Sequence, residues 1–371
     1  MSESNRIEYI DALRGFVMLL VVLGHVPMYC YHHLSGISFS TIPSTFHLAL
    51  FFFISGWFVN SRAVRNADAT LRLRYDNGNG RTEPRRNGIT ELRSCGLKVR
   101  EKFVQLIVPT MVFFLLYCWL FDIDIIENLW DDKYKSGYWF CIVLFCFYVI
   151  LTLTLTITVT RTKTKKLGGA LLCLILAAVF LMFNTNAVTR LLTEWHIPNL
   201  LCLQQWQYFI FFYMGHMAHR YQEQFFDWLD NGRVMAAGIL LFFGSLFAYY
   251  HQPVGLLEIK MAFILWGGLG SVLSFAFFRK YKDSFSRETY IGRTLQYIGR
   301  RTLDVYLLHF FFLPKSLSGL GVALMGNGNQ TVELFVSLAI AMIVIALCLL
   351  MGNIIRLSPQ LAHWVLGAKR V

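Results

Sequence analysis

Charged residues are scarce in this sequence. Only 15% of its 371 residues are Asp, Glu, Lys or Arg, whereas 56% are hydrophobic and the mean hydropathy is +0.50. Soluble domains usually carry about 25% charged residues. A deficit of this size over a chain of this length excludes an ordinary soluble protein and predicts one embedded in lipid. The high aromatic share, 16%, suits lipid-facing surfaces and the interfacial belts of a membrane protein.

The sequence also lacks cysteine motifs for disulfides or metals. Most of its eight cysteines lie in apolar runs, and Cys141 and Cys146 are five positions apart, which is not a metal-ligand spacing. We expect these residues to be free thiols, buried like other small hydrophobic side chains. No bound metal or cofactor is predicted.

Signals for secretion or for a separate soluble domain are missing as well. The first apolar run, 16–23, is flanked by charged residues and has no small-residue cleavage site after it, so we interpret it as a retained transmembrane helix. The longest polar segment, about 64–101, is rich in arginine and carries Asn-Gly turn signals. It is too short and too polar for its own core. We therefore expect one membrane domain over 1–371, with a basic cytoplasmic loop at about 64–101.

Long apolar segments dominate the rest of the chain. A helix that spans a bilayer needs roughly 20 mostly apolar residues. The candidate segments are approximately 9–30, 43–63, 103–122, 138–159, 167–186, 199–218, 234–250, 258–278, 299–316 and 332–355. The predicted fold is all-α, a polytopic membrane bundle of about ten transmembrane helices.

Lysine and arginine are distributed unevenly between the connecting loops. With the N-terminus placed in the cytoplasm, the inside segments hold 29 of the 34 basic residues and the outside segments hold 5. This is the bias expected of cytoplasmic loops, so both termini are predicted to be cytoplasmic. The net charge of +12 is then mainly a topology signal, and we expect no binding to nucleic acid.

The first predicted span contains three polar residues: Asp11, Arg14 and His25. Arg14 and His25 are eleven positions apart, which puts them on one helix face about 16 Å from each other. An imidazole at that depth is suited to act as a general base near neutral pH. The alternative is a histidine satisfied by a hydrogen bond to another helix. Arg14 either binds a substrate or forms an ion pair with Asp11, its neighbour at i, i+3.

Two later predicted spans also contain polar residues. His47 begins the second span at a depth comparable with His25, so the two histidines are predicted to flank one cavity, unless His47 is simply interfacial. Ser55, beside Gly56, either contacts substrate or permits close helix packing. Tyr306 and His309 face one side of the ninth span at i, i+3. They either line an acceptor cavity, which we favour, or cap a packing network.

Together these residues resemble the opening and closing motifs of the acyltransferase-3 family, most closely its stand-alone branch described as fucose 4-O-acetylase-like. The motifs are Asp11-x-Leu13-Arg14-Gly15, the Arg14-x10-His25 spacing, Phe46-His47 leading into Phe52-Phe53-Ile54-Ser55-Gly56, Lys102-Phe103 with Leu106-Ile107-Val108-Pro109, Trp139-Phe140, Phe211-Phe212-Tyr213-Met214-Gly215, and Gly299 followed by Leu303 and Tyr306-Leu307-Leu308-His309. The resemblance covers nearly the whole chain.

The resemblance implies a ten-helix enzyme of the cell's inner membrane that transfers an acyl group, usually acetyl from acetyl-CoA, to a hydroxyl of a cell-surface or lipid-linked glycan. It also implies that His25 is the essential histidine and Arg14 its motif partner. One departure is clear. The family often has an Arg-x-x-Arg pair before the third helix, where this chain has Lys98, Arg100 and Lys102 instead.

The mechanism we expect is direct acyl transfer with His25 as general base. His47 or Tyr306 would hold the developing oxyanion, with Ser55, Trp139 and His309 at the substrate site. Some members of a basic set would bind the phosphates of the donor: Lys98, Arg100, Lys102, Arg300 and Arg301. Two alternatives stay open. One is a transporter or flippase for a glycan or lipid-linked intermediate, and the other is a non-catalytic partner that organises a glycan-synthesis complex.

Overall fold

The computed structural model describes residues 7–31, 42–59, 97, 99–132, 134–159, 164–183, 188, 190–191, 194, 199–251, 256–326 and 329–368. Over these residues the chain is helical and has no β-strand. Lys98 and most of the predicted basic loop at 64–101 lie outside the described residues.

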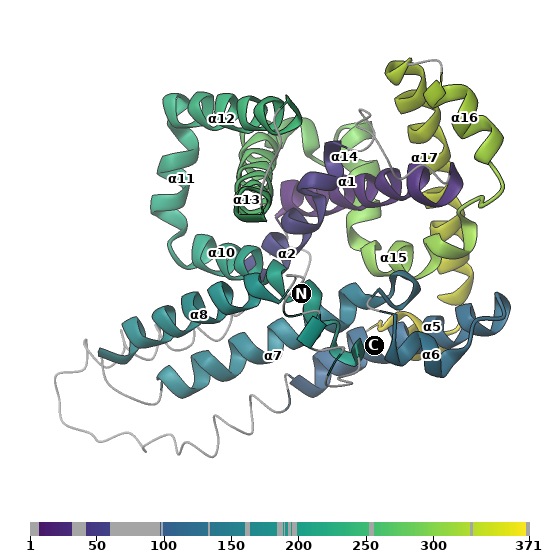
Figure 1. The fold of residues 1–371 in the computed structure, drawn as a ribbon, viewed down its shortest axis with the longest axis horizontal. Coiled ribbons are helices and arrows are strands. Elements are labelled where there is room, and N and C mark those ends of the chain that lie inside the picture. Colours follow the sequence, from purple (N-terminus) through teal and green to yellow (C-terminus); the bar gives the residue numbers. More distant parts are fainter. Residues whose placement is uncertain are drawn as a thin grey trace.

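Fifteen α-helices are described, together with short 3-10 and π segments (Figure 1). The helices are α1 (Glu8–His25), α2 (His47–Trp57), α5 (Val108–Leu120), α6 (Ile125–Trp130), α7 (Trp139–Val159), α8 (Thr164–Met182), α10 (Phe209–Arg220), α11 (Gln222–Asp230), α12 (Gly232–His251), α13 (Leu256–Lys280), α14 (Tyr290–Arg300), α15 (Thr302–Phe312), α16 (Ser318–Gly326), α17 (Gln330–Ile355) and α18 (Pro359–Leu366).

The helices are those of a membrane bundle. Within the described residues, five are long and apolar enough to cross a bilayer: Glu8–Cys30, Val99–Leu120, Gly232–Tyr249, Ile259–Lys280 and Gln330–Ile355. Four shorter apolar helices accompany them: His47–Trp57, Trp139–Thr154, Ala170–Met182 and Thr302–Phe312. The prediction of an all-α membrane bundle is therefore confirmed. Each of the ten predicted spans contains a helix, but the count of ten membrane crossings stays a prediction.

Several spans are less regular than a hydropathy pattern suggests. α1 continues into a π-helical segment, Val26–Cys30, which begins one residue before Pro27. Proline lacks the N–H that an α-helix needs, so the hydrogen-bond pattern changes there. The sixth span begins as a 3-10 helix, Leu203–Tyr208, and only then becomes α10. α2 has 11 residues, about half of the predicted length.

Helix α1 is the centre of the bundle. It is the most buried of the five long helices, with 72% of its apolar window inside the protein, whereas α12 has 11%. Its backbone touches that of α14, because a side chain on Gly15 would overlap the carbonyl oxygen of Leu295 and one on Gly299 would overlap that of Asp11. Only glycine permits two helices to approach this closely. The contact fixes the position of α1 along α14.

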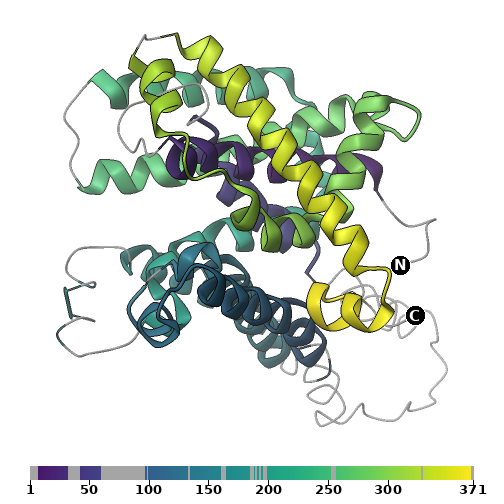
Figure 2. The same ribbon diagram turned by 90° about the vertical axis from the view of Figure 1, so that its right-hand side faces the viewer.

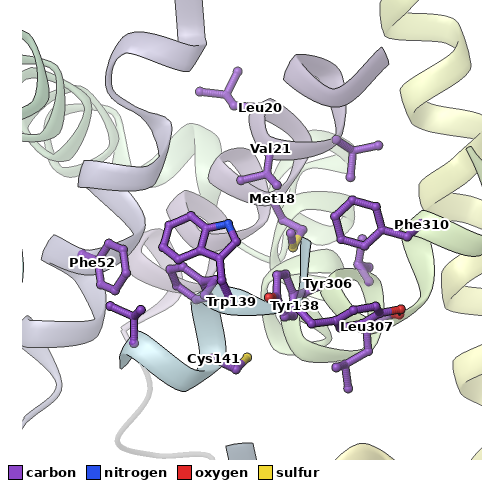
Figure 3. Packing of buried hydrophobic residues seen from close by; sticks show 14 of the residues in the cluster. Met18, Leu20, Val21, Phe52, Tyr138, Trp139, Cys141, Tyr306, Leu307 and Phe310 are labelled. Atoms are coloured by element: carbon purple, nitrogen blue, oxygen red, sulfur yellow. The ribbon is translucent and has the colours of Figure 1, made fainter. Parts of the chain in front are cut away.

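Most of the helices belong to one of two groups. Figures 1 and 2 show α5, α6, α7 and α8 gathered on one side of the molecule and α1, α12, α13 and α14 on the other. α15 joins the groups, since it contacts both α5 and α1. Figure 3 shows the aromatic side chains packed at this junction, among them Trp139 from α7 and Tyr306 and Phe310 from α15.

Candidate active site

The first site feature is a hydrogen bond between His25 and His309, which we call the histidine pair. Nδ1 of His25, the last residue of α1, lies 3.0 Å from Nε2 of His309 on α15. The two rings are nearly parallel, with an interplanar angle of 6° and centroids 5.1 Å apart. His309 is fully buried, whereas His25 keeps partial exposure. The pair therefore has one fully buried member and one that is partly exposed.

The hydrogen bonds of His309 assign the protons of the pair. Its Nδ1 lies 2.7 Å from the carbonyl oxygen of Tyr306 and 3.1 Å from that of Val305. A carbonyl only accepts, so this Nδ1 carries the hydrogen and, in neutral His309, Nε2 accepts. Nδ1 of His25 must then donate to it. The Nε2 atom of His25 is left with a lone pair and makes no hydrogen bond within the described part of the chain.

Aromatic rings surround the histidine pair. The ring of Phe310 lies 3.9 Å from that of His309 and 5.3 Å from that of His25, centroid to centroid. Tyr29 packs edge-on against His25 at 5.5 Å. These contacts hold both imidazoles in a fixed orientation.

A short segment before α7 is joined by two hydrogen bonds to α15, the helix that carries His309. The Tyr306 hydroxyl donates to the carbonyl oxygen of Gly137 at 2.9 Å, and the Tyr138 hydroxyl donates to that of Leu307 at 3.0 Å. Gly137 has φ +99°, and a side chain there would overlap the ring of Phe310. Tyr306 therefore contacts this segment through its hydroxyl, and its place at an acceptor cavity stays a prediction.

His47 lies close to His25, as its position in the sequence suggested. The edge of its ring packs beside Gly24, one residue before His25. His47 is 5% exposed, and its Nδ1 lies 2.9 Å from the carbonyl oxygen of Pro43. That nitrogen therefore donates, so a neutral His47 has only an accepting nitrogen left for a ligand.

Among the described residues, the hydrogen-bond donor of Ser55 already has an acceptor, whereas that of Trp139 does not. The Ser55 hydroxyl donates to the carbonyl oxygen of Phe51 at 2.8 Å, one turn back on α2. Trp139 stacks on Tyr208 with centroids 5.9 Å apart and an angle of 28°. In Figure 3 its indole nitrogen is turned toward Val21 of α1, one turn before His25. Within the described residues, this indole N–H has no acceptor.

Arg14 joins α1 to the start of α15. Its guanidinium lies 3.9 Å from the carboxylate of Asp11, and Nη2 donates to the hydroxyl of Thr302 at 3.2 Å. The predicted Asp11–Arg14 ion pair is thus present, though long. The hydrogen bond to Thr302 was not predicted, because it joins residues 288 positions apart.

Two further arginines meet at Asp304, and we call Arg301, Asp304 and Arg356 the arginine cluster. Arg356 donates to both carboxylate oxygens of Asp304, at 2.7 and 3.0 Å, and Arg301 lies at 3.4 Å. The Asp304 side chain is 1% exposed, whereas both arginine side chains are 26% exposed. Gly352 makes room for the carboxylate on α17. In the sequence, Asp304 is an isolated acidic residue in an apolar span and Arg301 is a predicted phosphate-binding residue, but their contact with Arg356 was not predicted.

Three other predicted donor-binding residues lie outside the arginine cluster. Arg300 is exposed, with its Nε bonded to the carbonyl oxygen of Gln296, and Arg100 is exposed as well. Lys102 donates to Gln105 at 3.3 Å and lies over the ring of Tyr148. The structure brings Arg14 and Arg301 to the same end of α15.

A second buried carboxylate, also missed from the sequence, supports the segment after His25. The hydroxyls of Tyr31 and Ser337 lie 3.1 Å apart, and Ser337 donates to Glu333 at 2.8 Å. This chain of hydrogen bonds ties the end of the π-helical segment to α17. Among the described residues, no three His, Cys, Asp or Glu side chains lie close enough to hold a metal ion.

The arrangement is chemically suited to proton transfer. It presents an unprotonated imidazole nitrogen inside a helical bundle, with an orienting partner behind it and positive charge at one end of the same helices. No curated protein matches the chain, and no solved structure matches it either. The family model for the acyltransferase-3 acyltransferase domain matches residues 7–351. The chain belongs to the acyltransferase-3 family, and it is a membrane acyltransferase.

Proposed function

We propose that this protein is an O-acyltransferase of the cell's inner membrane. It would move an acyl group, acetyl in the first instance, from acyl-CoA to a hydroxyl of a cell-surface or lipid-linked glycan. The family membership supports acyl transfer, and the resemblance of the motifs supports the donor and the acceptor. The observation that carries the mechanism is the histidine pair, because it leaves Nε2 of His25 free to accept a proton.

In this mechanism the acceptor hydroxyl lies against His25. Its oxygen attacks the thioester carbonyl carbon while Nε2 of His25 takes its proton. The tetrahedral intermediate then collapses, the carbon–sulfur bond breaks, and the imidazolium returns the proton to the departing thiolate. The products are an ester on the glycan and a free thiol. General base catalysis of this kind contributes about 10²–10⁴-fold to a rate.

His309 would act on His25 as a positioning residue. Its Nε2 accepts from Nδ1 of His25, which fixes both the ring and the tautomer in which Nε2 is unprotonated. When His25 becomes an imidazolium, the same hydrogen bond is to a charged donor and is stronger. The partner therefore favours the charged state that forms during the reaction.

The indole of Trp139 is the best remaining donor for the oxyanion. The hydroxyl of Tyr306 is already bonded to Gly137, and neutral His47 has used its N–H on Pro43. The Trp139 indole nitrogen is turned toward Val21 of α1 (Figure 3). A donor held in advance at the developing charge typically contributes about 10²–10³-fold.

The test is acyl transfer by the purified full chain in lipid nanodiscs. Acetyl-CoA carrying a labelled acetyl group is supplied together with surface glycans from cells that lack the protein. We expect a labelled acetyl mass increment on the glycan that mild base removes, as an ester requires. His25→Ala should abolish it, whereas His363→Ala, at a histidine on α18 outside the site, should not.

Two results would contradict the proposal. Full acylation by folded His25→Ala would exclude His25 as the base. Movement of a labelled glycan across the nanodisc or vesicle membrane without any donor, and without acylation, would favour the transporter alternative.

A further inference from the structure

The arginine cluster carries more positive charge than its one carboxylate needs. Arg356 alone already satisfies both oxygens of Asp304. Arg301 adds a second guanidinium at 3.4 Å, and Arg14 lies at the neighbouring residue, Thr302. A structural ion pair between α15 and α17 would require a single arginine.

The unused hydrogen-bond donors of the cluster face away from Asp304. A guanidinium has five N–H groups, and Arg356 uses two of them on the carboxylate. In the described part of the chain the other three have no acceptor. The arginine side chains are partly exposed while the carboxylate is sealed behind them. The carboxylate thus acts as a clamp that holds two partly exposed guanidinium groups.

We infer that Arg301 and Arg356, held by Asp304, form a binding subsite for a phosphate group. Arginine matches phosphate well, since its planar fork donates two parallel hydrogen bonds to two oxygens. Positive charge that is partly buried and only half neutralised is costly, and a bound dianion such as a phosphomonoester would compensate it.

The place of the subsite on the helices indicates an elongated ligand. Asp304 and His309 are both on α15, about 7.5 Å apart along its axis, and Arg14 and His25 are about 16 Å apart along α1. A ligand with its phosphate at the cluster therefore reaches the histidine pair only through a long arm. This identification rests on the proposed function, and it favours a thioester carried on a phosphorylated arm over a small acyl phosphate.

A phosphate could also come from an anionic lipid headgroup, so the experiment needs two arms. The full chain is placed in nanodiscs of zwitterionic phosphatidylcholine, and the affinity for CoA, dephospho-CoA and pantetheine is measured by calorimetry. In the second arm, short-chain phosphatidylglycerol replaces CoA. None of these probes needs acyl transfer, so a failure of glycan acylation leaves this test intact.

Arg301→Gln and Arg356→Gln are each expected to weaken CoA binding by about tenfold or more, the loss of one charged hydrogen-bond pair. Pantetheine, which has no phosphate, should bind equally to all variants. The matched control is Arg293→Gln, an exposed arginine on α14 that lies over Tyr290. Its CoA affinity should stay within twofold of the unmodified chain.

Arg356→Gln leaves Asp304 with a weaker partner, and a lower yield of folded protein is expected for that reason alone. The double variant Asp304→Asn with Arg356→Gln removes both charges and keeps the test decisive. Equal affinity for both CoA and phosphatidylglycerol in folded Arg301→Gln and in the double variant would overturn the inference. Loss of phosphatidylglycerol binding with unchanged CoA affinity would support the phosphate subsite and identify its ligand as lipid.

Discussion

The histidine pair and the arginine cluster lie near opposite ends of the same helix, α15, yet they satisfy buried polar groups in opposite ways. The pair is uncharged and is held by a single hydrogen bond with two backbone carbonyls behind it. The cluster is charged and depends on ion pairs to a sealed carboxylate. A group that must gain and lose a proton is best held by neutral partners. A group that must attract an anion needs fixed charge.

This contrast predicts that damage to the cluster lowers stability and damage to the pair lowers activity. The largest effect is expected for Asp304→Asn, which leaves two partly buried guanidinium groups without their carboxylate. Breaking one partner of a buried ion pair typically costs about 3–5 kcal/mol in the free energy of unfolding. Unfolding of the detergent-solubilised protein should show the loss.

The chain supplies a matched control in Asp230→Asn. Asp230 also binds an arginine through both oxygens, Arg279, but its side chain is 63% exposed. The hydrogen bond from Arg279 holds the pKa of the Asp230 carboxyl below its usual value. Its contribution to stability is therefore present at neutral pH and is lost as the pH falls through that lowered pKa. A loss in Asp230→Asn as large as that in Asp304→Asn would break the comparison.

The next effect concerns His309→Gln. The amide keeps some hydrogen-bonding capacity but cannot hold Nδ1 of His25 in the same geometry. We expect kcat to fall by about 10–100-fold, corresponding to the loss of about 1.4–2.7 kcal/mol of transition-state stabilisation, with KM and the unfolding free energy nearly unchanged. The pH dependence of kcat should shift as well, because the partner of the base has changed. An unchanged profile would mean that His309 only packs.

Tyr306→Phe should have a smaller effect. It removes the hydrogen bond to Gly137 and keeps the ring that packs beside His309. A typical hydrogen bond of this kind contributes about 1 kcal/mol to stability. The unfolding free energy should fall by about that amount while kcat changes only slightly. A collapse of activity would show that the hydroxyl touches substrate, as the sequence had suggested.

The smallest effect is expected when His309→Gln is added to His25→Ala. If His309 acts only through His25, the double variant should be as inactive as His25→Ala alone, within about twofold. Residues that act as a unit are non-additive in this way. A further large loss would give His309 a role of its own. Initial rates of label transfer at equal amounts of folded protein provide the measurement.

The sequence predicted the helical membrane class correctly, and its candidate site residues stay predictions. Composition and apolar segments fixed the fold class, because lipid imposes length and hydropathy on each spanning helix. His25, Arg14 and Asp11 were found because ionisable groups are rare within a span. Each partner that completes the site was harder to find. His309 was predicted to line a cavity or to cap a packing network, but its hydrogen bond to His25 was not predicted, and Arg356 was counted only as a topology signal.

The contacts that were not predicted share one physical reason. Helical periodicity relates residues within one helix, but the contacts of His25 with His309 and of Arg14 with Thr302 join opposite ends of the chain. Which helices meet is decided by packing, here by the close approach of α1 and α14 at Gly15 and Gly299. Irregular segments were missed for a similar reason, since a π-helical turn at Val26–Cys30 has the same hydropathy as an α-helical one.

The approach of α1 to α14 has a consequence for biosynthesis. α1 is made first, but the glycine surface that it packs on emerges from the ribosome nearly 300 residues later. During most of translation α1 is therefore in the membrane before Asp11, Arg14 and His25 have met the residues that contact them in the folded protein. Ribosome-stalled chains that end before α14 should remain within reach of insertion factors, and the reaction centre closes only when synthesis is almost complete.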